Sequence, residues 1–179
     1  VRRVRGSLSG SSVDAAQCCK FISFNTVAAS DAYVKTGRVF FEARIDAAVG
    51  CVQLGWISDG FARSDEPSDG TGVGDDLHSW AGDGLRQQRW HGGEGAGFDT
   101  AWATGDVVGV AADLDAGRLH FAVNGAWACA FEDISVPASG LAPALSAESG
   151  FAATLNLGNA AFAFGPPDDS YASVQSATT

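Results

Sequence analysis

Three histidines are the side chains of this sequence with the clearest capacity for acid–base chemistry. A serine hydrolase needs a base within hydrogen-bond reach of its nucleophile and a third group that orients that base. His120 lies between two apolar residues of a strand-like segment, a pattern that predicts a solvated side chain on a strand. His78 and His91 flank a predicted hairpin and could face each other across it, although packing explains them more simply. Since no Gly-x-Ser-x-Gly motif occurs either, we expect no catalytic residues and no enzymatic activity.

Residues 58–77 form the most acidic stretch of the chain. Between Asp59 and Asp76, six carboxylates accompany a single cation, Arg63. A calcium-binding loop aligned on this run would place Pro67, which has no side-chain oxygen, at a ligand position, and no predicted helix flanks it. We therefore expect no metal, and we interpret the run as a solvated acidic loop or as a recognition surface for a basic peptide.

Five tryptophans raise the possibility of a carbohydrate site, because aromatic rings stack on sugars. A lectin-like, carbohydrate-binding sandwich is the alternative function that this observation keeps open. Trp56 and Trp80, however, occupy alternating strand positions that the pattern assigns to the core. Trp102 lies in a glycine-rich segment just before Gly105, and its role stays ambiguous.

The segment 106–131 carries the strongest secondary-structure pattern. Two apolar runs are joined by a tight turn at 115–117. The dipeptide Asn124-Gly125, which is typical of two-residue hairpins, then leads into a third run from Trp127 to Phe131. This pattern predicts three antiparallel strands with short connections.

Further strands are predicted on both sides of this meander. Residues 37–46 alternate, with Val39, Phe41, Ala43 and Ile45 on one face and the residues between them on the other. Similar runs occupy residues 51–57, 79–81, 86–91, 141–146 and 151–157, and long loops are expected at 58–77 and 92–105. No segment has a sustained helical period, so the sequence predicts an all-β fold, a two-sheet antiparallel β-sandwich.

The composition limits the classes of partner and the compartment. The chain has 179 residues and a net charge of −10, which argues against nucleic-acid binding, and no apolar run is long enough for membrane insertion. Four cysteines without metal-ligand spacing predict free, buried thiols in a reducing compartment, which is intracellular and cytoplasmic in this interpretation.

The expected organisation is one domain with short flanking segments. Residues 1–12, rich in serine, glycine and arginine, predict a flexible lead-in, and residues 13–167 contain the sandwich. The polar residues 168–179 predict a tail or linker. The absence of methionine, including at the first position, indicates a segment of a larger protein.

Several of these strands resemble the SPRY domain family, in order along most of the chain. The strongest similarity is the run Gly105-Asp106-Val107-Val108-Gly109 followed by Asp113-Leu114, Phe121 and Asn124-Gly125. Other similar segments are Gly37 to Ala43, Gln53-Leu54-Gly55-Trp56, Asp76 to Gly84, Leu141-Ala142-Pro143-Ala144, Leu155-Asn156-Leu157-Gly158 and Phe162-Ala163-Phe164. Within the family, Asp75-Asp76 and Gln88 to His91 are most similar to the domains of ryanodine receptors, while Phe41 replaces the usual Trp or Tyr.

The resemblance implies a concanavalin-like jelly-roll sandwich that acts as a non-catalytic protein–protein interaction module without a cofactor. Such modules occur inside larger proteins, and their partners are proteins or peptides. The peptide-gripping loops of well-known members do not align with the loops of this chain, so the resemblance implies a functional class and no particular ligand.

Long loops on a rigid sandwich are the expected place for recognition. Aromatic and charged residues in them are the types enriched at interface hot spots, and six are candidates for binding: Asp59, Phe61, Arg63, Asp83, Arg86 and Trp102. Phe61 has an alternative role, because it could fold back and pack against the sandwich.

Overall fold

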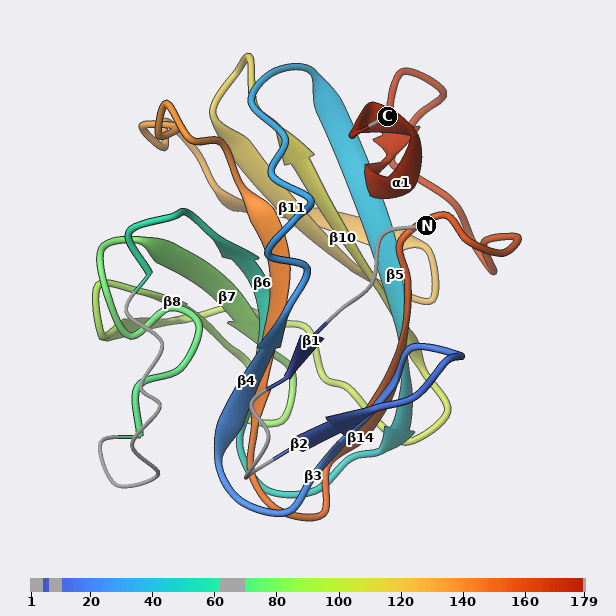
Figure 1. The fold of residues 1–179 in the computed structure, drawn as a ribbon. Coiled ribbons are helices and arrows are strands. Elements are labelled where there is room, and N and C mark those ends of the chain that lie inside the picture. Colours follow the sequence, from blue (N-terminus) through green and yellow to red (C-terminus); the bar gives the residue numbers. More distant parts are fainter. Residues whose placement is uncertain (1–4, 7–10, 62–69, 179) are drawn as a thin grey trace.

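A computed structural model of the chain describes residues 5–6, 11–61 and 70–178, which form fifteen strands and one short helix (Figure 1). The first strands are β1 (Arg5–Gly6), β2 (Ser11–Val13), β3 (Cys18–Phe21), β4 (Asn25–Ala28), β5 (Arg38–Ala47) and β6 (Val52–Ile57). The middle strands are β7 (Ser79–Asp83), β8 (Gln88–His91), β9 (Glu94–Gly97), β10 (Val107–Asp113), β11 (Arg118–Val123) and β12 (Ala126–Phe131). The last elements are β13 (Ala142–Ala147), β14 (Ala152–Asn156), β15 (Ala172–Ser173) and α1 (Val174–Ala177).

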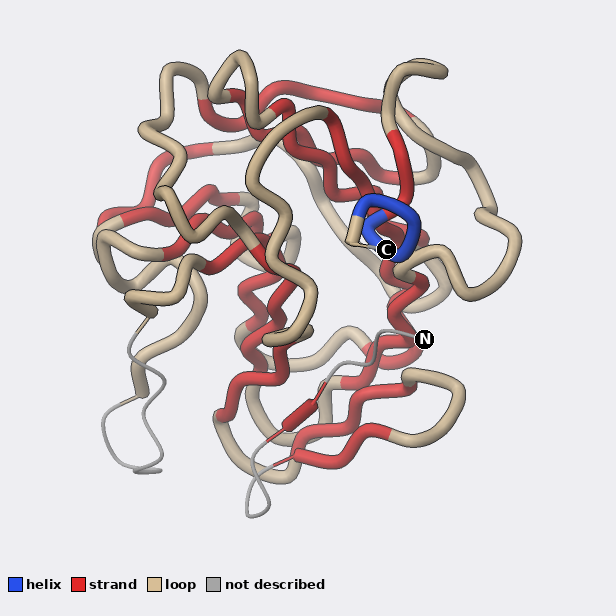
Figure 2. Tube along the Cα trace, turned by 45° about the horizontal axis from the view of Figure 1, so that its top comes forward, coloured by secondary structure: helices blue, strands red, loops and turns tan. Residues whose placement is uncertain are grey.

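These strands form two sheets. The seven-stranded sheet has the order β1-β4-β13-β6-β7-β8-β9, and the eight-stranded sheet has the order β12-β11-β10-β5-β14-β3-β2, with β15 beside β5. Every pair is antiparallel except β15 with β5. Figure 2 shows that strands are the main regular structure and that the helix is a single turn near the C-terminus. The predicted all-β, two-sheet sandwich is confirmed.

The core between the sheets follows the alternation seen in β5. Val39, Phe41, Ala43 and Ile45 are each at most 1 % exposed, as predicted for the inward face. The ring of Phe41 meets that of Trp56 on β6 edge to face, with centroids 5.2 Å apart. This pair joins the two sheets, since β5 and β6 belong to different sheets.

The predicted meander is also confirmed. Strand β10 pairs with β11 and β11 with β12, each in antiparallel register. The β11–β12 turn places Asn124 at φ 50° and Gly125 at φ 83°, and two successive positive φ values are what a type I′ hairpin requires.

The outer face of β5 is covered by residues 162–174, which we call the C-terminal strap. Phe40 and Glu42, which alternate with the core residues, are only 3 % and 4 % exposed. The ring of Phe162 lies 4.3 Å from that of Phe40. The carboxylate of Glu42 accepts hydrogen bonds from three successive backbone N–H groups, those of Ala163, Phe164 and Gly165, at 2.7 to 2.9 Å.

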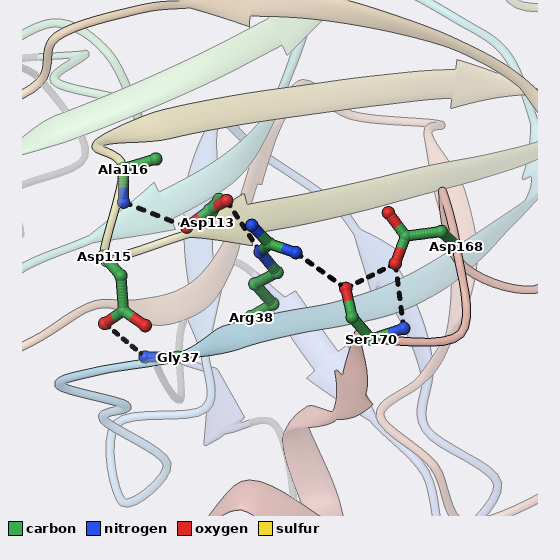
Figure 3. A network of polar contacts seen from close by, with 7 residues as sticks. All are labelled: Gly37, Arg38, Asp113, Asp115, Ala116, Asp168 and Ser170. Carbon is green, nitrogen blue, oxygen red and sulfur yellow. Dashed lines mark hydrogen bonds and ion pairs between the residues drawn. The ribbon is translucent and has the colours of Figure 1, made fainter.

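A second polar network holds the far end of the strap (Figure 3). Arg38 on β5 pairs with Asp113 on β10 at 2.8 Å and donates to the hydroxyl of Ser170 at 3.0 Å. Hydrogen bonds from Ser170 lower the pKa of Asp168. Beyond this network β15 adds to β5, and Val174 is fully buried. The strap is therefore part of the folded sandwich.

The outer face of the seven-stranded sheet has its own cover. Ile57, Ala81, Ala142 and Ala144 point away from the main core and form a second apolar cluster. Phe61 and Val73, from the β6–β7 loop, complete this cluster, and both are buried. As a result β6, β7 and β13 are buried along their whole length, on both faces.

Several elements lie where the sequence suggested loops. Strand β9 lies within the glycine-rich 92–105 segment. Strand β1 and part of β2 lie within residues 1–12, and β15 and α1 lie within residues 168–179. These short segments contain few apolar side chains, so their pairing comes from backbone hydrogen bonds that leave no sequence pattern. In the part of the chain that the structure describes, no helix has the length and apolar character needed to cross a membrane.

The Glu42 anchor gives a first prediction. We expect Glu42→Gln to lower the free energy of unfolding by about 2 kcal/mol, because the amide nitrogen would face a backbone N–H in place of one acceptor oxygen and the remaining hydrogen bonds would lose their charged acceptor. Urea unfolding followed by tryptophan fluorescence measures the change, and hydrogen exchange at residues 163–165 should accelerate. Glu94→Gln, at an exposed position of β9, is the matched control. Equal stability of the two variants would contradict the anchoring role.

Candidate functional site

Three of the six predicted binding residues come together at the β7–β8 turn. Asp83, at the end of β7, is completely buried and accepts hydrogen bonds from the backbone N–H groups of Leu85 and Arg86, both at 2.9 Å. It also forms an ion pair with Nε of Arg86, whose side chain is 39 % exposed. The guanidinium carbon of Arg86 lies 4.4 Å from the ring centroid of Trp90. Arg86 is thus presented at the surface in a fixed orientation.

Trp102 packs against this turn from the inside of the fold. It is 5 % exposed, and its backbone N–H donates to the carbonyl of Gly84 at 3.2 Å. A Cβ atom added to Gly84 would lie 1.9 Å from the indole of Trp102, so the turn can rest on the ring only because residue 84 is glycine. Asp83 and Trp102 therefore position Arg86 from inside the fold.

Arg86 opens onto a groove of about 330 Å³, which we call the Arg86 groove. Its lining consists of Phe24, Cys51, Gln53, Gly70, Asp75, Arg86 and Glu148. The two carboxylates are engaged in holding loops, since Asp75 accepts from Nε2 of Gln53 at 2.6 Å and Glu148 accepts from the N–H of Cys51 at 3.1 Å. Gln53 is 2 % exposed, and its Oε1 atom has no hydrogen-bond partner among the described residues.

Exposed apolar side chains lie on the loops that border the Arg86 groove. Ile22 is 74 % exposed and Val49 is 50 % exposed. Gly150 connects them, because its N–H donates to the carbonyl of Phe21 and a Cβ added to it would lie 3.8 Å from Val49. The groove thus presents a cation, and the loops that border it expose an apolar rim formed by Ile22 and Val49.

The other predicted binding residues do not share this groove. Asp59 is exposed and lines a second groove, of about 570 Å³, at the opposite ends of β6 and β7. Phe61 is 8 % exposed and packs in the outer cluster of the seven-stranded sheet, so it takes the second of its two predicted roles, packing against the sandwich. Arg63 lies outside the residues that the structure describes.

The three histidines pack and form contacts within the fold. His91 stacks on Trp80, with centroids 4.7 Å apart, and its Nδ1 donates to the carbonyl of Ser79 at 2.8 Å. His78 lies 3.5 Å from the hydroxyl of Ser58, and burial lowers the pKa of His120. Within residues 5–6, 11–61 and 70–178, no group of three His, Cys, Asp or Glu side chains could hold a metal ion.

All four cysteines are free thiols, but their burial differs from the expectation. Cys19 is buried, Cys18 and Cys51 are half-buried, and Cys129 is exposed. Cys129 reaches the surface because β12 is the edge strand of the eight-stranded sheet. Burial raises the pKa of Cys51, in the Arg86 groove, to about 11, and the nearby Arg86 partly opposes this effect.

The tryptophans divide into two groups. Trp56, Trp80 and Trp102 are at most 5 % exposed, so they present no free ring face to a sugar. Trp90 and Trp127 are half-buried. The carbohydrate-binding alternative thus loses the support of most of the rings that suggested it.

Two comparisons with known proteins bear on this site. A family model described as the SPRY domain matches residues 38–160, which include most of both sheets and Arg86. A protein named E3 ubiquitin-protein ligase RKP, from Arabidopsis thaliana, is 32 % identical over 155 residues. The alignment covers 85 % of this chain and 12 % of the relative, so the chain spans about an eighth of that protein.

The burial of Phe61 predicts a loss of stability on truncation. We expect Phe61→Ala to lower the free energy of unfolding by about 3 kcal/mol, since the change leaves a cavity in the outer cluster. Leu77→Ala is the matched control, because Leu77 is an apolar residue of the same loop that is 73 % exposed. Urea denaturation of both variants checks the prediction. A stability loss as small as that of the control would show that Phe61 is not packed as described.

The raised pKa of Cys51 predicts slow alkylation at neutral pH. Only the thiolate reacts, and at pH 8 a thiol with a pKa of about 11 is almost entirely protonated. We expect the rate of carbamidomethylation of Cys51 to rise about tenfold per pH unit between about pH 8 and 10, as the thiolate fraction grows. Mass spectrometry after timed exposure to iodoacetamide measures this rate. A rate that levels off below about pH 9 would contradict the raised pKa.

Proposed function

This chain belongs to the SPRY domain family of protein-interaction modules, and on that premise we propose that it is a non-catalytic module that binds a segment of a partner protein in the Arg86 groove. The observation that carries the proposal is a guanidinium that Asp83 and the ring of Trp90 hold in one orientation where it opens onto a groove.

Gln53 is a structural part of the groove. Its Nε2 atom donates to Asp75 at 2.6 Å, and its Oε1 atom is buried against Gly72, so neither atom is offered to a ligand. Of the described residues that line the groove, Arg86 is the cation, and it is the polar group with which a partner segment can pair.

The guanidinium of Arg86 identifies the main contact. Its Nε atom is committed to Asp83, while its terminal nitrogens carry further donors in a fixed plane. A carboxylate or amide side chain of the partner matches this donor set. Because Asp83, Trp90 and Trp102 already fix the side chain, little conformational entropy is lost on binding.

The apolar rim supplies the remaining contact area. Ile22 and Val49 are two of the four most exposed large apolar side chains among the described residues, and they share loops with the groove residues Phe24 and Cys51. Exposed apolar groups next to a cationic anchor are typical of interaction surfaces. We infer that the partner segment places apolar residues on this rim.

The setting of the module is also part of the proposal. The relative is named a ubiquitin-protein ligase, and this chain matches about an eighth of it, so we infer that the module serves as a recognition segment of a longer protein. Four free thiols fit a reducing, intracellular compartment.

The test replaces Arg86 and compares the proteins captured from a native extract. We expect Arg86→Lys to reduce partner capture about tenfold, because lysine keeps the charge beside Asp83 but loses the planar donor set. Arg118→Lys, at an exposed position of β11, is the matched control and should capture the partner normally. Quantitative mass spectrometry of the bound fraction measures the difference, and melting curves verify that both variants are folded. Unchanged capture by Arg86→Lys would overturn the choice of groove.

A further inference from the structure

The groove at the opposite end of β6 and β7, which we call the acidic groove, has a different chemistry. It is lined by residues at the ends of β6, β7, β8 and β12 and by the start of the β12–β13 loop: Ser58, Asp59, Leu77, His78, Trp80, His91, Phe131, Glu132, Asp133, Ile134, Ser135 and Pro137. We propose that this groove is a second binding site, which takes an arginine side chain from a basic protein segment. The proposal does not rest on the function of the Arg86 groove.

Charge is the first argument. Asp59, Glu132 and Asp133 line the acidic groove, and its lining contains neither lysine nor arginine. The ion pairs found among the described residues involve other carboxylates, those of Asp46, Asp83 and Asp113. The acidic groove therefore offers three carboxylates to a cationic ligand without first breaking an ion pair of the described structure.

The ring stack in the groove selects arginine among the cations. Trp80 and His91 are stacked with an interplanar angle of 7°. Trp80 is 4 % exposed and His91 is half-buried, so the imidazole is the outer ring of the stack. The hydrogen bond from its Nδ1 atom to the carbonyl of Ser79 fixes the ring plane. A planar guanidinium can lie flat on such a ring while its edge pairs with carboxylates, whereas the compact ammonium group of lysine has no plane to stack.

The wall that carries Glu132 and Asp133 is held in place. The N–H of Ile134 donates to the carbonyl of Gly117 at 2.9 Å, which fastens the β12–β13 loop to the β10–β11 turn. A Cβ added to Gly117 would lie 2.6 Å from the carbonyl oxygen of Ile134, so this approach requires glycine. Ligand binding then costs little ordering of the loop.

An apolar side chain stands beside the carboxylates. Leu77 is 73 % exposed and lines the acidic groove. The aliphatic stem of an arginine, or an apolar neighbour in the same peptide, can cover it. Exposed carboxylates alone give weak ion pairs. The Trp80–His91 stack and Leu77 add the stacking and apolar contacts that a binding site needs.

The two grooves can be tested separately, because they lie at opposite ends of the strands that connect them. Strand β6 runs from Val52, next to the Arg86 groove, to Ile57, next to the acidic groove, a span of about 17 Å. Substitutions separated by more than about 7–10 Å usually act independently. A substitution that abolishes binding in one groove should therefore leave binding in the other groove measurable.

The experiment titrates the chain with fluorescein-labelled peptides of glycine and serine that carry either two central arginines or two central lysines, and it follows fluorescence anisotropy. We expect saturable binding of the arginine peptide and about fivefold weaker binding of the lysine peptide. The double variant Glu132→Gln with Asp133→Asn should weaken the arginine peptide about tenfold. The double variant Asp99→Asn with Asp169→Asn removes the same charge from exposed positions outside the groove, and it should bind normally.

A further variant separates stacking from charge. His91→Ala should weaken the arginine peptide and bring its affinity to that of the lysine peptide, while Arg86→Lys should change neither. Equal loss in the two charge-neutralising double variants would overturn the proposal, because it would show attraction to net charge alone. Absence of binding up to about 1 mM peptide, or equal affinity for both peptides in the unmodified chain, would overturn it as well.

Discussion

The central strands of both sheets are buried on two faces, and the structure depends on keeping their outer faces covered. For the eight-stranded sheet the decisive interaction is that of Glu42, a buried carboxylate that accepts three backbone N–H groups. A carboxylate removed from water without such partners would be strongly destabilising. Those hydrogen bonds fix the strap, and the strap in turn buries Phe40.

The cover on the seven-stranded sheet links folding to both grooves. The β6–β7 loop packs Phe61 and Val73 onto this sheet. Asp59 lies just before Phe61 and reaches the acidic groove, while Asp75 follows Val73 and holds Gln53 in the Arg86 groove. One loop therefore contributes to the architecture and to two surfaces of different charge.

The sequence allowed the sandwich, its central meander and the burial of Trp56 and Trp80 to be predicted, because alternation and the Asn124-Gly125 turn are local patterns. Strand β9 has no large apolar side chain, and β3 and β4 are only four residues long, too short for their apolar residues to show a clear alternation. The role of Glu42 depends on residues 163–165, which are distant in sequence. A charged residue in an alternating strand ordinarily indicates solvent, and only the folded chain reveals its cover.

The candidate site was predictable in part for the same reason. Residue types identified Arg86, Asp83 and Trp102, and the structure brings these three together. The sequence could not separate a buried positioning residue from an exposed binding residue. Asp83, Trp102 and Arg86 are all residue types common at interfaces, and only their burial in the fold distinguishes them. The stack of His91 on Trp80 was missed, because it depends on side-chain geometry that residue spacing does not encode.

The position of the strap along the chain has a consequence for biosynthesis. Ribosomes make proteins from the N-terminus, and Ala163 follows Glu42 by 121 residues. Until that segment emerges, the nascent polypeptide exposes Phe40 and an uncompensated carboxylate in the middle of its largest sheet. The cover of this sheet is consequently completed late, by a contact of high sequence separation.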